Sequence, residues 1–425
     1  MKSVLPVLLC LFLWALSLQT FAAGPFSVKN KKTSAIVKVK DTGALLLPGT
    51  QPPSSNLYIM LFNPSSGALL DGPHSMTAKV KRKTGEVKMW YHKEKNHSII
   101  KYKPSRRTLL YKVWQTLPDT VLLDALTQDM VCVPSGTFVM GNSKDVSEGN
   151  PDEQPVHTVK IDSFFMDSCE VSNGDMRDVL QWAYDNGKVI ADNTTVRNVE
   201  GDQQELLDLD GPECQINFSF GKFSVVSGKT NYPCVEVTWY GACAFCNLRS
   251  EREGKTPCYN FSSWSCDWTA NGYRLPTEAE WEKAVRGGHE SNRFAWASIQ
   301  IISHTYANYM STGSLSYDAS GNAGYHPVYN TGTTPYTNPG GAFEANGYGL
   351  HDMPGNVWEW CWDRYSATYY AGSPIHNPRG PVLGTTRILR GGSWKEYPGY
   401  CRAADRGDHV PTGSFNHFGF RCVKQ

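Results

Sequence analysis

Residues 271–288 read NGYRLPTEAEWEKAVRGG and contain the signals of a helix start. Pro276 precedes Thr277, whose hydroxyl suits the first cap of a helix, and Glu280 three residues later completes a capping box. The stretch therefore predicts a short helix that begins after Thr277. Two further helical patterns precede it, SNGDMRDVLQWAYDNG (172–187) and TWYGACAFCNLRSERE (238–253).

Much of the chain beyond this helix lacks periodic patterns. Stretches rich in Gly, Asn, Tyr and Trp fill most of residues 287–387. So much irregular chain cannot satisfy its backbone polar groups through regular structure alone. We therefore expect side chains, disulfides or bound ions to hold these loops together.

The charge distribution divides the chain into two parts. The 425 residues suggest two or three domains, and the net charge of +1 provides no global field that attracts nucleic acid. Residues 24–115 hold 17 Lys and Arg against 4 acids, so the remainder is acidic. We predict a small basic β-rich domain over residues 24–125 and an α+β domain over residues 126–425.

Short runs rich in β-branched and aromatic residues define the predicted β-rich domain. They are AIVKVKD (35–41), NLYIMLF (56–62), TAKVKR (77–82) and EVKMWY (86–91). Its lysines alternate with Val and Ile, which favours the solvated face of half-buried strands. Adhesion to an acidic polymer or to a cell surface is the alternative interpretation.

The first 23 residues are typical of a secretory signal peptide. Lys2 precedes an apolar run over residues 4–18, and small residues near Ala22 and Ala23 suit cleavage. An uncleaved anchor is the alternative interpretation. No later stretch is apolar enough to span a bilayer, so we expect a secreted or periplasmic protein with no membrane span after cleavage.

Removal of Cys10 with the signal peptide leaves eleven cysteines. In an exported protein these favour disulfides, and the odd count predicts at least one free thiol. Cys258 and Cys266 flank a short aromatic loop and could pair locally. Cys243 and Cys246 imitate a C-x-x-C redox pair, but their surroundings favour an amphipathic helix.

Several motifs occur in a fixed order, and together they resemble the formylglycine-generating enzyme family, also called sulfatase-modifying factors. They are MGN (140–142), DEQPVHTVKIDSFFMDSCEVSN (152–173), YPCVEVTWYGACAFC (232–246), the stretch 271–288, NGYGLHDMPGNVWEW (346–360), RILRGGSW (387–394) and GFRC (419–422). The resemblance covers residues 131–425. It implies a decorated C-type-lectin-like α+β domain with little regular structure.

The resemblance also implies an activity, for which this chain lacks at least one residue, and an alignment gapped on residues 402–404 removes the second match as well. Family enzymes use two cysteine thiolates, Cu(I) and O2 to oxidise a sulfatase cysteine to formylglycine, and soft thiolates suit Cu(I). The pair stands three and eight residues after Gly-Gly-Ser. Here Glu396 and Cys401 occupy these positions after Ser393. Ser393 and Cys401 therefore remain weak catalytic candidates, and we do not expect a copper site.

The structural Ca2+ positions of the family are better preserved. The first site maps to Asp352, the carbonyls of Gly355 and Val357, and Glu359, which supply the oxygen ligands that a hard cation needs. A second site maps to three further residues and the Ser320 carbonyl. These three residues are Asn308, Tyr309 (through its carbonyl) and Asp318. We expect calcium to hold loops together at both sites.

The resemblance implies a disulfide between Cys246 and Cys422, which would tie a helix to the C-terminal strand. The family's other helix cysteine is replaced by Val285, so Cys401 lacks its expected mate. Either Cys243 or Cys361 could take that place.

Residues 394–418 have the composition of an adaptable binding surface, because Tyr and Phe offer contact area while Asn and Ser offer hydrogen bonds. Its candidate contact residues are Trp394, Tyr397, Tyr400, His409, Phe415, Asn416 and His417. The RGGSW…CR…GFR pattern also resembles variable proteins of diversity-generating retroelements, which use this fold for ligand binding. We therefore expect a module that binds a protein or glycan. The alternative is a copper-dependent oxidase whose partner is a sulfatase polypeptide.

Overall fold

The computed structural model describes part of the basic domain and nearly all of the domain that follows. The described residues are 26–30, 36–39, 57–62, 69–81, 86–93, 96–103, 108–112 and 130–425, except 145–146 and 297–299. The chain divides into two compact units, residues 1–130 with Gln425 and residues 131–424. The expected signal peptide, residues 1–23, lies outside the described residues. None of the helices in the described ranges is both long and apolar enough to cross a membrane.

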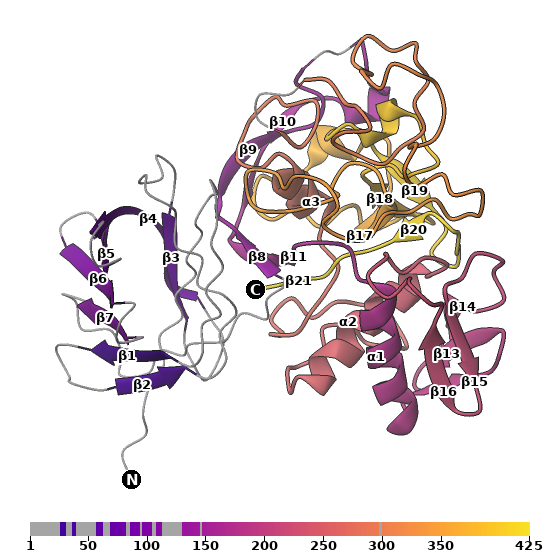
Figure 1. The fold of residues 1–425 in the computed structure, drawn as a ribbon, viewed down its shortest axis with the longest axis horizontal. Coiled ribbons are helices and arrows are strands. Elements are labelled where there is room, and N and C mark those ends of the chain that lie inside the picture. Colours follow the sequence, from indigo (N-terminus) through magenta and orange to yellow (C-terminus); the bar gives the residue numbers. More distant parts are fainter. Residues whose placement is uncertain are drawn as a thin grey trace. The chain divides into compact units, whose positions relative to one another are not determined.

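The first unit contains one sheet with the strand order β2-β1-β7-β6-β5-β4-β3 (Figure 1). Its strands are β1 (Phe26–Asn30), β2 (Ile36–Val39), β3 (Leu57–Phe62), β4 (Leu69–Lys81), β5 (Glu86–Lys93), β6 (Asn96–Lys103) and β7 (Thr108–Lys112). All neighbouring strands are antiparallel except β1 and β7, which are parallel. Each of the four predicted runs overlaps one of these strands.

The second unit combines few helices with many short strands, which confirms the mixed α+β class. Its helices are α1 (Asn173–Asp185), α2 (Trp239–Arg252) and α3 (Glu278–Val285), at the three predicted places. The capping box of α3 is present, since the Thr277 hydroxyl accepts from Glu280 N and the Glu280 carboxylate accepts from Thr277 N. Between α3 and β17, the described residues form no helix or strand.

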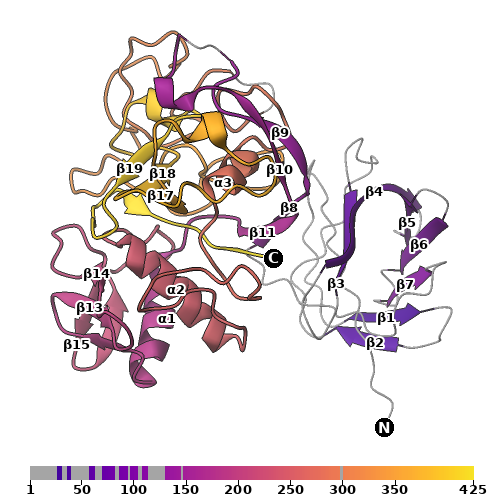
Figure 2. The same ribbon diagram turned by 180° about the vertical axis from the view of Figure 1, so that it is seen from behind.

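Short sheets complete the second unit. Its strands are β8 (Met130–Val133), β9 (Gly136–Met140), β10 (His157–Ile161), β11 (Phe164–Asp167), β12 (Val189–Ala191), β13 (Thr195–Asn198), β14 (Glu205–Asp208), β15 (Ile216–Ser219), β16 (Lys222–Val225), β17 (Trp358–Arg364), β18 (Arg387–Arg390), β19 (Gly407–His409), β20 (Phe418–Gly419) and β21 (Val423–Lys424). Figures 1 and 2 show α1, α2 and strands β13–β15 at one end of the unit, with α3 and strands β17–β19 nearer its middle.

Two sheets bring the end of the chain against its earlier elements. One has the order β19-β18-β17-β20, and the other, β21-β11-β8, pairs Val423 with Met166. Helix α3 contacts β9, β10, β17 and β18. Trp281 of α3 and Trp360 of β17 are fully buried, as is Val423. The C-terminal residues are therefore part of the fold's interior.

Candidate functional site

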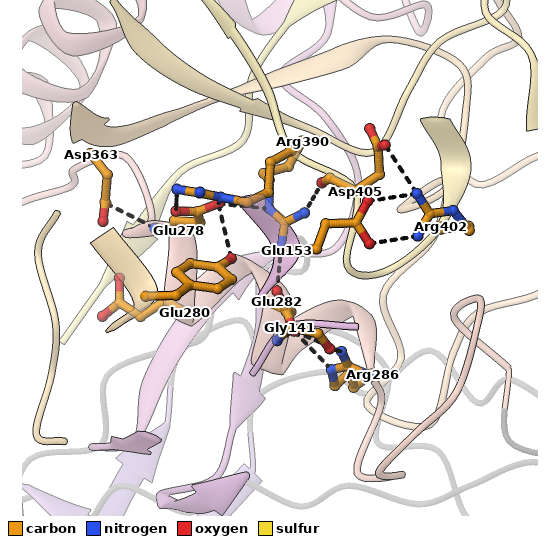
Figure 3. A network of polar contacts seen from close by, with 12 residues as sticks. Gly141, Glu153, Glu278, Glu280, Glu282, Arg286, Asp363, Arg390, Arg402 and Asp405 are labelled. Carbon is orange, nitrogen blue, oxygen red and sulfur yellow. Dashed lines mark hydrogen bonds and ion pairs between the residues drawn. The ribbon is translucent and has the colours of Figure 1, made fainter. Parts of the chain in front are cut away.

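Buried arginines fix the segment that follows β18 and carries the candidate catalytic and binding residues. Arg390 reaches from β18 to Glu282 on α3, and Figure 3 shows this pair in the centre of a polar network. Arg402 makes two 2.7 Å hydrogen bonds to Glu153, which belongs to η2 (Pro151–Glu153). Arg406 forms a second two-pronged pair with Glu278. The segment is thus held at three points.

Two acids of this network, Glu278 and Asp405, respond in opposite ways to their surroundings. Burial opposes ionisation of Glu278, but the guanidinium groups of Arg406 and Arg390 hold its pKa below the usual value. Asp405 differs, because burial raises its pKa to about 8 despite Arg402 and Arg390 nearby. Such pairs are costly to break, since removal of one partner leaves a buried uncompensated charge.

Ser393 and Cys401 lie inside the protein. The Ser393 hydroxyl accepts from Lys395 N at 3.3 Å, and Glu396 N donates to the Ser393 carbonyl at 3.0 Å, so Ser393 shapes a turn. Cys401 ends the 3-10 helix η4 (Pro398–Cys401), is 1% exposed and is a thiol. Burial raises the pKa of this thiol well above its usual value. Reactive cysteines instead have a lowered pKa and some exposure.

The candidate binding residues divide into exposed and supporting positions. Tyr397, Tyr400 and Phe415 are between 41% and 48% exposed. Trp394, by contrast, is buried, and its indole N–H donates to the Asn416 carbonyl at 3.2 Å. It supports the surface from below.

The histidines of this surface surround the Phe415 ring. The His409 ring centroid lies 5.0 Å from that of Phe415, and the His417 centroid lies 5.7 Å from it. Burial, together with Lys395 and His409, lowers the pKa of His417 to about 4. His417 is therefore neutral at physiological pH, and its side chain contributes ring area and a hydrogen bond to the Asn416 amide oxygen.

The first predicted calcium position is built from well-bonded side chains. The two Asp352 oxygens accept from Asn338 Nδ2 at 3.0 Å and from Gly341 N at 2.6 Å. Glu359 forms a two-pronged ion pair with Arg421 and also accepts from the Trp281 indole at 2.7 Å. Gly355 and Val357, which stand between these two acids in the sequence, are both buried.

Two oxygens beside Asp352 lack hydrogen-bond partners. They are Glu170 Oε2 and Asn338 Oδ1. Burial, and then repulsion from Asp352, raises the pKa of Glu170. Sequence reasoning missed Glu170 although it lies within the quoted stretch 152–173. The charged groups that act on Glu170 here are Asp352, Arg421 and Glu359.

The second predicted calcium position has less free ligand capacity. Asp318 accepts from the Tyr309 and Ser311 hydroxyls, each at 2.7 Å, and from two backbone N–H groups. The Tyr309 carbonyl oxygen lies 3.0 Å from His304 Nε2. Asn308 Oδ1 has no partner. In the described ranges, no group of three or more His, Cys, Asp or Glu side chains is placed to hold a metal ion, so carbonyl and amide oxygens would have to complete either site.

The predicted disulfide partners lie next to each other as thiols. Cys246 Sγ on α2 and Cys422 Sγ are 3.6 Å apart, and both residues are fully buried. A disulfide requires about 2.05 Å between the sulfurs. Cys258 and Cys266 are also thiols, and a backbone bridge joins Tyr259 to Cys266.

Comparison with known proteins identifies relatives of the second unit. A family model described as a sulfatase-modifying factor enzyme 1-like domain matches residues 119–425. The formylglycine-generating enzyme of Streptomyces coelicolor is 32% identical over 331 residues, which cover 70% of this chain and 89% of that enzyme. The serine/threonine-protein kinase pkn1 of Chlamydia caviae is 32% identical over 303 residues, covering 70% of this chain and 38% of that protein.

Solved structures with some similarity include Treponema denticola variable protein 1 and PvdO from Pseudomonas aeruginosa. The first is 25% identical, with a TM-score of 0.47, and the match covers 69% of this chain and 94% of that chain. The second is 23% identical, with a TM-score of 0.46 and coverage of 70% and 94%.

Proposed function

This chain belongs to the sulfatase-modifying factor enzyme 1-like family, and from that premise we propose that it is an exported ligand-binding module rather than an oxidase. One observation carries the proposal: Tyr397, Tyr400 and Phe415 are exposed on a segment that buried arginines hold in place. Rigid aromatic side chains provide contact area at a low cost in conformational entropy. The ligand is a protein or glycan, and the scaffold is a C-type-lectin-like domain.

The catalytic position supports binding over oxidation. Glu396 stands where the family has its first copper thiolate, and a carboxylate is a poor ligand for Cu(I). Cys401 offers a single buried thiol with a raised pKa. The signal-like residues 1–23 support secretion or a periplasmic location.

The test compares the wild-type protein with the triple variant Tyr397→Ala/Tyr400→Ala/Phe415→Ala. Phe220→Ala is the matched control, because Phe220 is fully exposed but lies outside this surface. The probes are an immobilised glycan array and peptides selected on the wild-type protein from a displayed library. We expect the triple variant to weaken binding at least about tenfold and the control to leave it unchanged. Equal binding by the triple variant, or no saturable ligand, contradicts the proposal.

Copper-dependent formylglycine generation on a sulfatase cysteine is the second candidate function, and the identity to formylglycine-generating enzymes favours it. The reduced protein would be loaded with Cu(I) and incubated under O2 with a Cys-x-Pro-x-Arg peptide, and the peptide mass would be measured. We expect no turnover. Conversion that depends on copper and is abolished in Cys401→Ser would establish the oxidase instead.

We also propose that Ca2+ is bound at the first site by Asp352, Glu359 and the carbonyls of Gly355 and Val357. Glu170 supports this, since its unpartnered oxygen lies beside Asp352. The ion would hold the loops that flank β17 and would take no part in chemistry. Calorimetric titration with CaCl2 should show one binding event, lost in Asp352→Asn. The absence of heat at millimolar Ca2+ would contradict the site.

A further inference from the structure

A group of four carboxylates lies beside the aromatic surface, and we call it the acidic cluster: Asp208, Asp210, Glu213 and Glu236. Asp208 ends β14, and Asp210 and Glu213 lie in the turn that follows. Glu236 comes from the segment before α2, and Asp208 N donates to the Glu236 carbonyl at 3.0 Å. A Cβ at Gly211 would lie 2.9 Å from Glu236 Cδ, so the Glu236 carboxyl packs directly against this turn.

The acidic cluster contains no basic partner. No ion pair to any of its four carboxylates occurs among the described residues. Asp208 Oδ1 accepts from Gly211 N at 2.9 Å, and Glu213 Oε1 accepts from the Thr334 hydroxyl at 2.8 Å. Neutral donors such as these leave the negative charge uncompensated.

Glu236 is the member that points to a ligand. It is only 4% exposed, and no hydrogen bond or ion pair in the described part of the chain reaches its carboxylate. Burial, followed by repulsion from Asp208 and Glu213, raises its pKa to about 7. A largely buried carboxylate without a protein partner can accept a donor or cation from outside the fold, and such a partner would offset the cost of its charge.

The acidic cluster is continuous with the aromatic surface. The Ser414 hydroxyl donates to Asp208 Oδ2 at 3.4 Å, and Glu236 N donates to the Phe415 carbonyl at 3.0 Å. Asp210 and Phe415 are both exposed, while Asp208 and Glu213 are half-buried. A cationic side chain that enters beside Phe415 would contact an aromatic ring and several carboxylates together, and both favour a guanidinium or ammonium group.

We propose that the acidic cluster binds an arginine or lysine side chain of a protein ligand, next to the Phe415 ring. The inference rests on the proposed binding function and sharpens it, because it selects a basic protein segment over a glycan. Glu236 and Asp208 would hold the charged end of the side chain, and Asp210 would attract it at the solvent-exposed edge. The carboxylates are spread from the surface to the interior, which suits a long side chain with its charge at the tip.

The experiment uses two fluorescein-labelled peptides, Gly-Arg-Tyr-Arg-Gly and the same peptide with citrulline in place of both arginines. Citrulline keeps the shape of arginine and removes its charge. Fluorescence anisotropy would be measured with wild-type protein, Glu236→Gln and the control Glu290→Gln, which removes an exposed acid outside the cluster. We expect the wild type and Glu290→Gln to bind the arginine peptide at least about tenfold more tightly than Glu236→Gln does.

Three outcomes would overturn the proposal. They are equal affinity for the arginine and citrulline peptides, unchanged affinity in Glu236→Gln, and the absence of saturable binding by wild-type protein. Competition by CaCl2 that the Glu236→Gln substitution abolishes would assign the cluster to a metal ion instead. If ligands selected on the wild-type protein require Tyr397, Tyr400 and Phe415 but tolerate Glu236→Gln, this inference fails while the proposed function stands.

Discussion

The second unit contains two groups of carboxylates with opposite surroundings. In the network around Arg390, each of Glu153, Glu278 and Glu282 has a guanidinium partner, and all three are buried (Figure 3). In the acidic cluster, Glu236 is almost as buried but has no cation beside it. The same kind of side chain therefore has a charged partner in one place and none in the other.

The difference shows what each group contributes. Paired charges bind segments far apart in the chain to one another, as Arg402 and Glu153 do across 249 residues. The carboxylates of the acidic cluster accept hydrogen bonds from neutral donors only, and their mutual repulsion weakens the fold. Proteins retain such strain where it serves a function. The contrast therefore distinguishes carboxylates that maintain the shape of the unit from carboxylates that have no cationic partner within it.

The largest effect should follow from breaking the paired network. Arg390→Met should lower the free energy of unfolding by about 3–5 kcal/mol, because Glu278 and Glu282 would lose a buried cation. Urea denaturation followed by tryptophan fluorescence measures this value. A loss below about 1 kcal/mol would show that Arg406 and Arg286 compensate the remaining charge. The pairing with Arg390 would then not explain the difference between the two groups of carboxylates.

The pH dependence of the free energy of unfolding should reveal the raised pKa of Glu236. Its pKa rises from 4.5 in the unfolded chain to about 7 in the fold, so the folded state binds the proton more tightly. The stabilisation that protonated Glu236 gives to the folded state is fully present below pH 4.5 and is lost as the pH rises through 7. The free energy of unfolding should fall by about 2–3 kcal/mol over this range. Urea denaturation between pH 5 and pH 8 should show this loss relative to Glu236→Gln. Parallel curves for the two proteins would contradict the unpaired state of Glu236.

Added salt should change the stability of the wild type relative to Glu236→Gln by a smaller amount. Raising NaCl from 0.1 to 1 M shortens the Debye length from about 10 to about 3 Å, which screens repulsion between partly exposed charges. At pH 8 we expect the wild type to gain about 1 kcal/mol of stability relative to Glu236→Gln. An equal response of the two proteins would place the repulsion elsewhere.

The smallest effect is expected at an exposed pair. Arg197 lies 4.0 Å from Glu205, and both side chains are more than a third exposed. Arg197→Met should change the free energy of unfolding by less than about 0.5 kcal/mol in the same urea assay. It serves as the reference for Arg390→Met, and a comparable loss in both would mean that burial does not decide the strength of these pairs.

Local signals in the sequence predicted the helix starts, but they could not predict ion pairs between residues far apart in the chain. The caps Thr277 and Glu280 lie three residues apart, so the start of α3 was predictable. Arg402 and Glu153 are far apart in sequence, and no periodicity links them. Glu236 was equally hidden, because whether a carboxylate finds a partner depends on the packing of several segments. The motif around Asp352 and Glu359 pointed to the correct loop but not to Glu170.

The pairing of β21 with β11 affects how the second unit folds during synthesis. Val423 and Lys424 fill places beside Met166 and Phe165, which were synthesised some 250 residues earlier. During translation, strand β11 therefore lacks its β21 partner until the final residues of this unit leave the ribosome. A chain in that state has not yet closed the sheet that joins β8, β11 and β21, so the unit completes its fold only after its last strand is made.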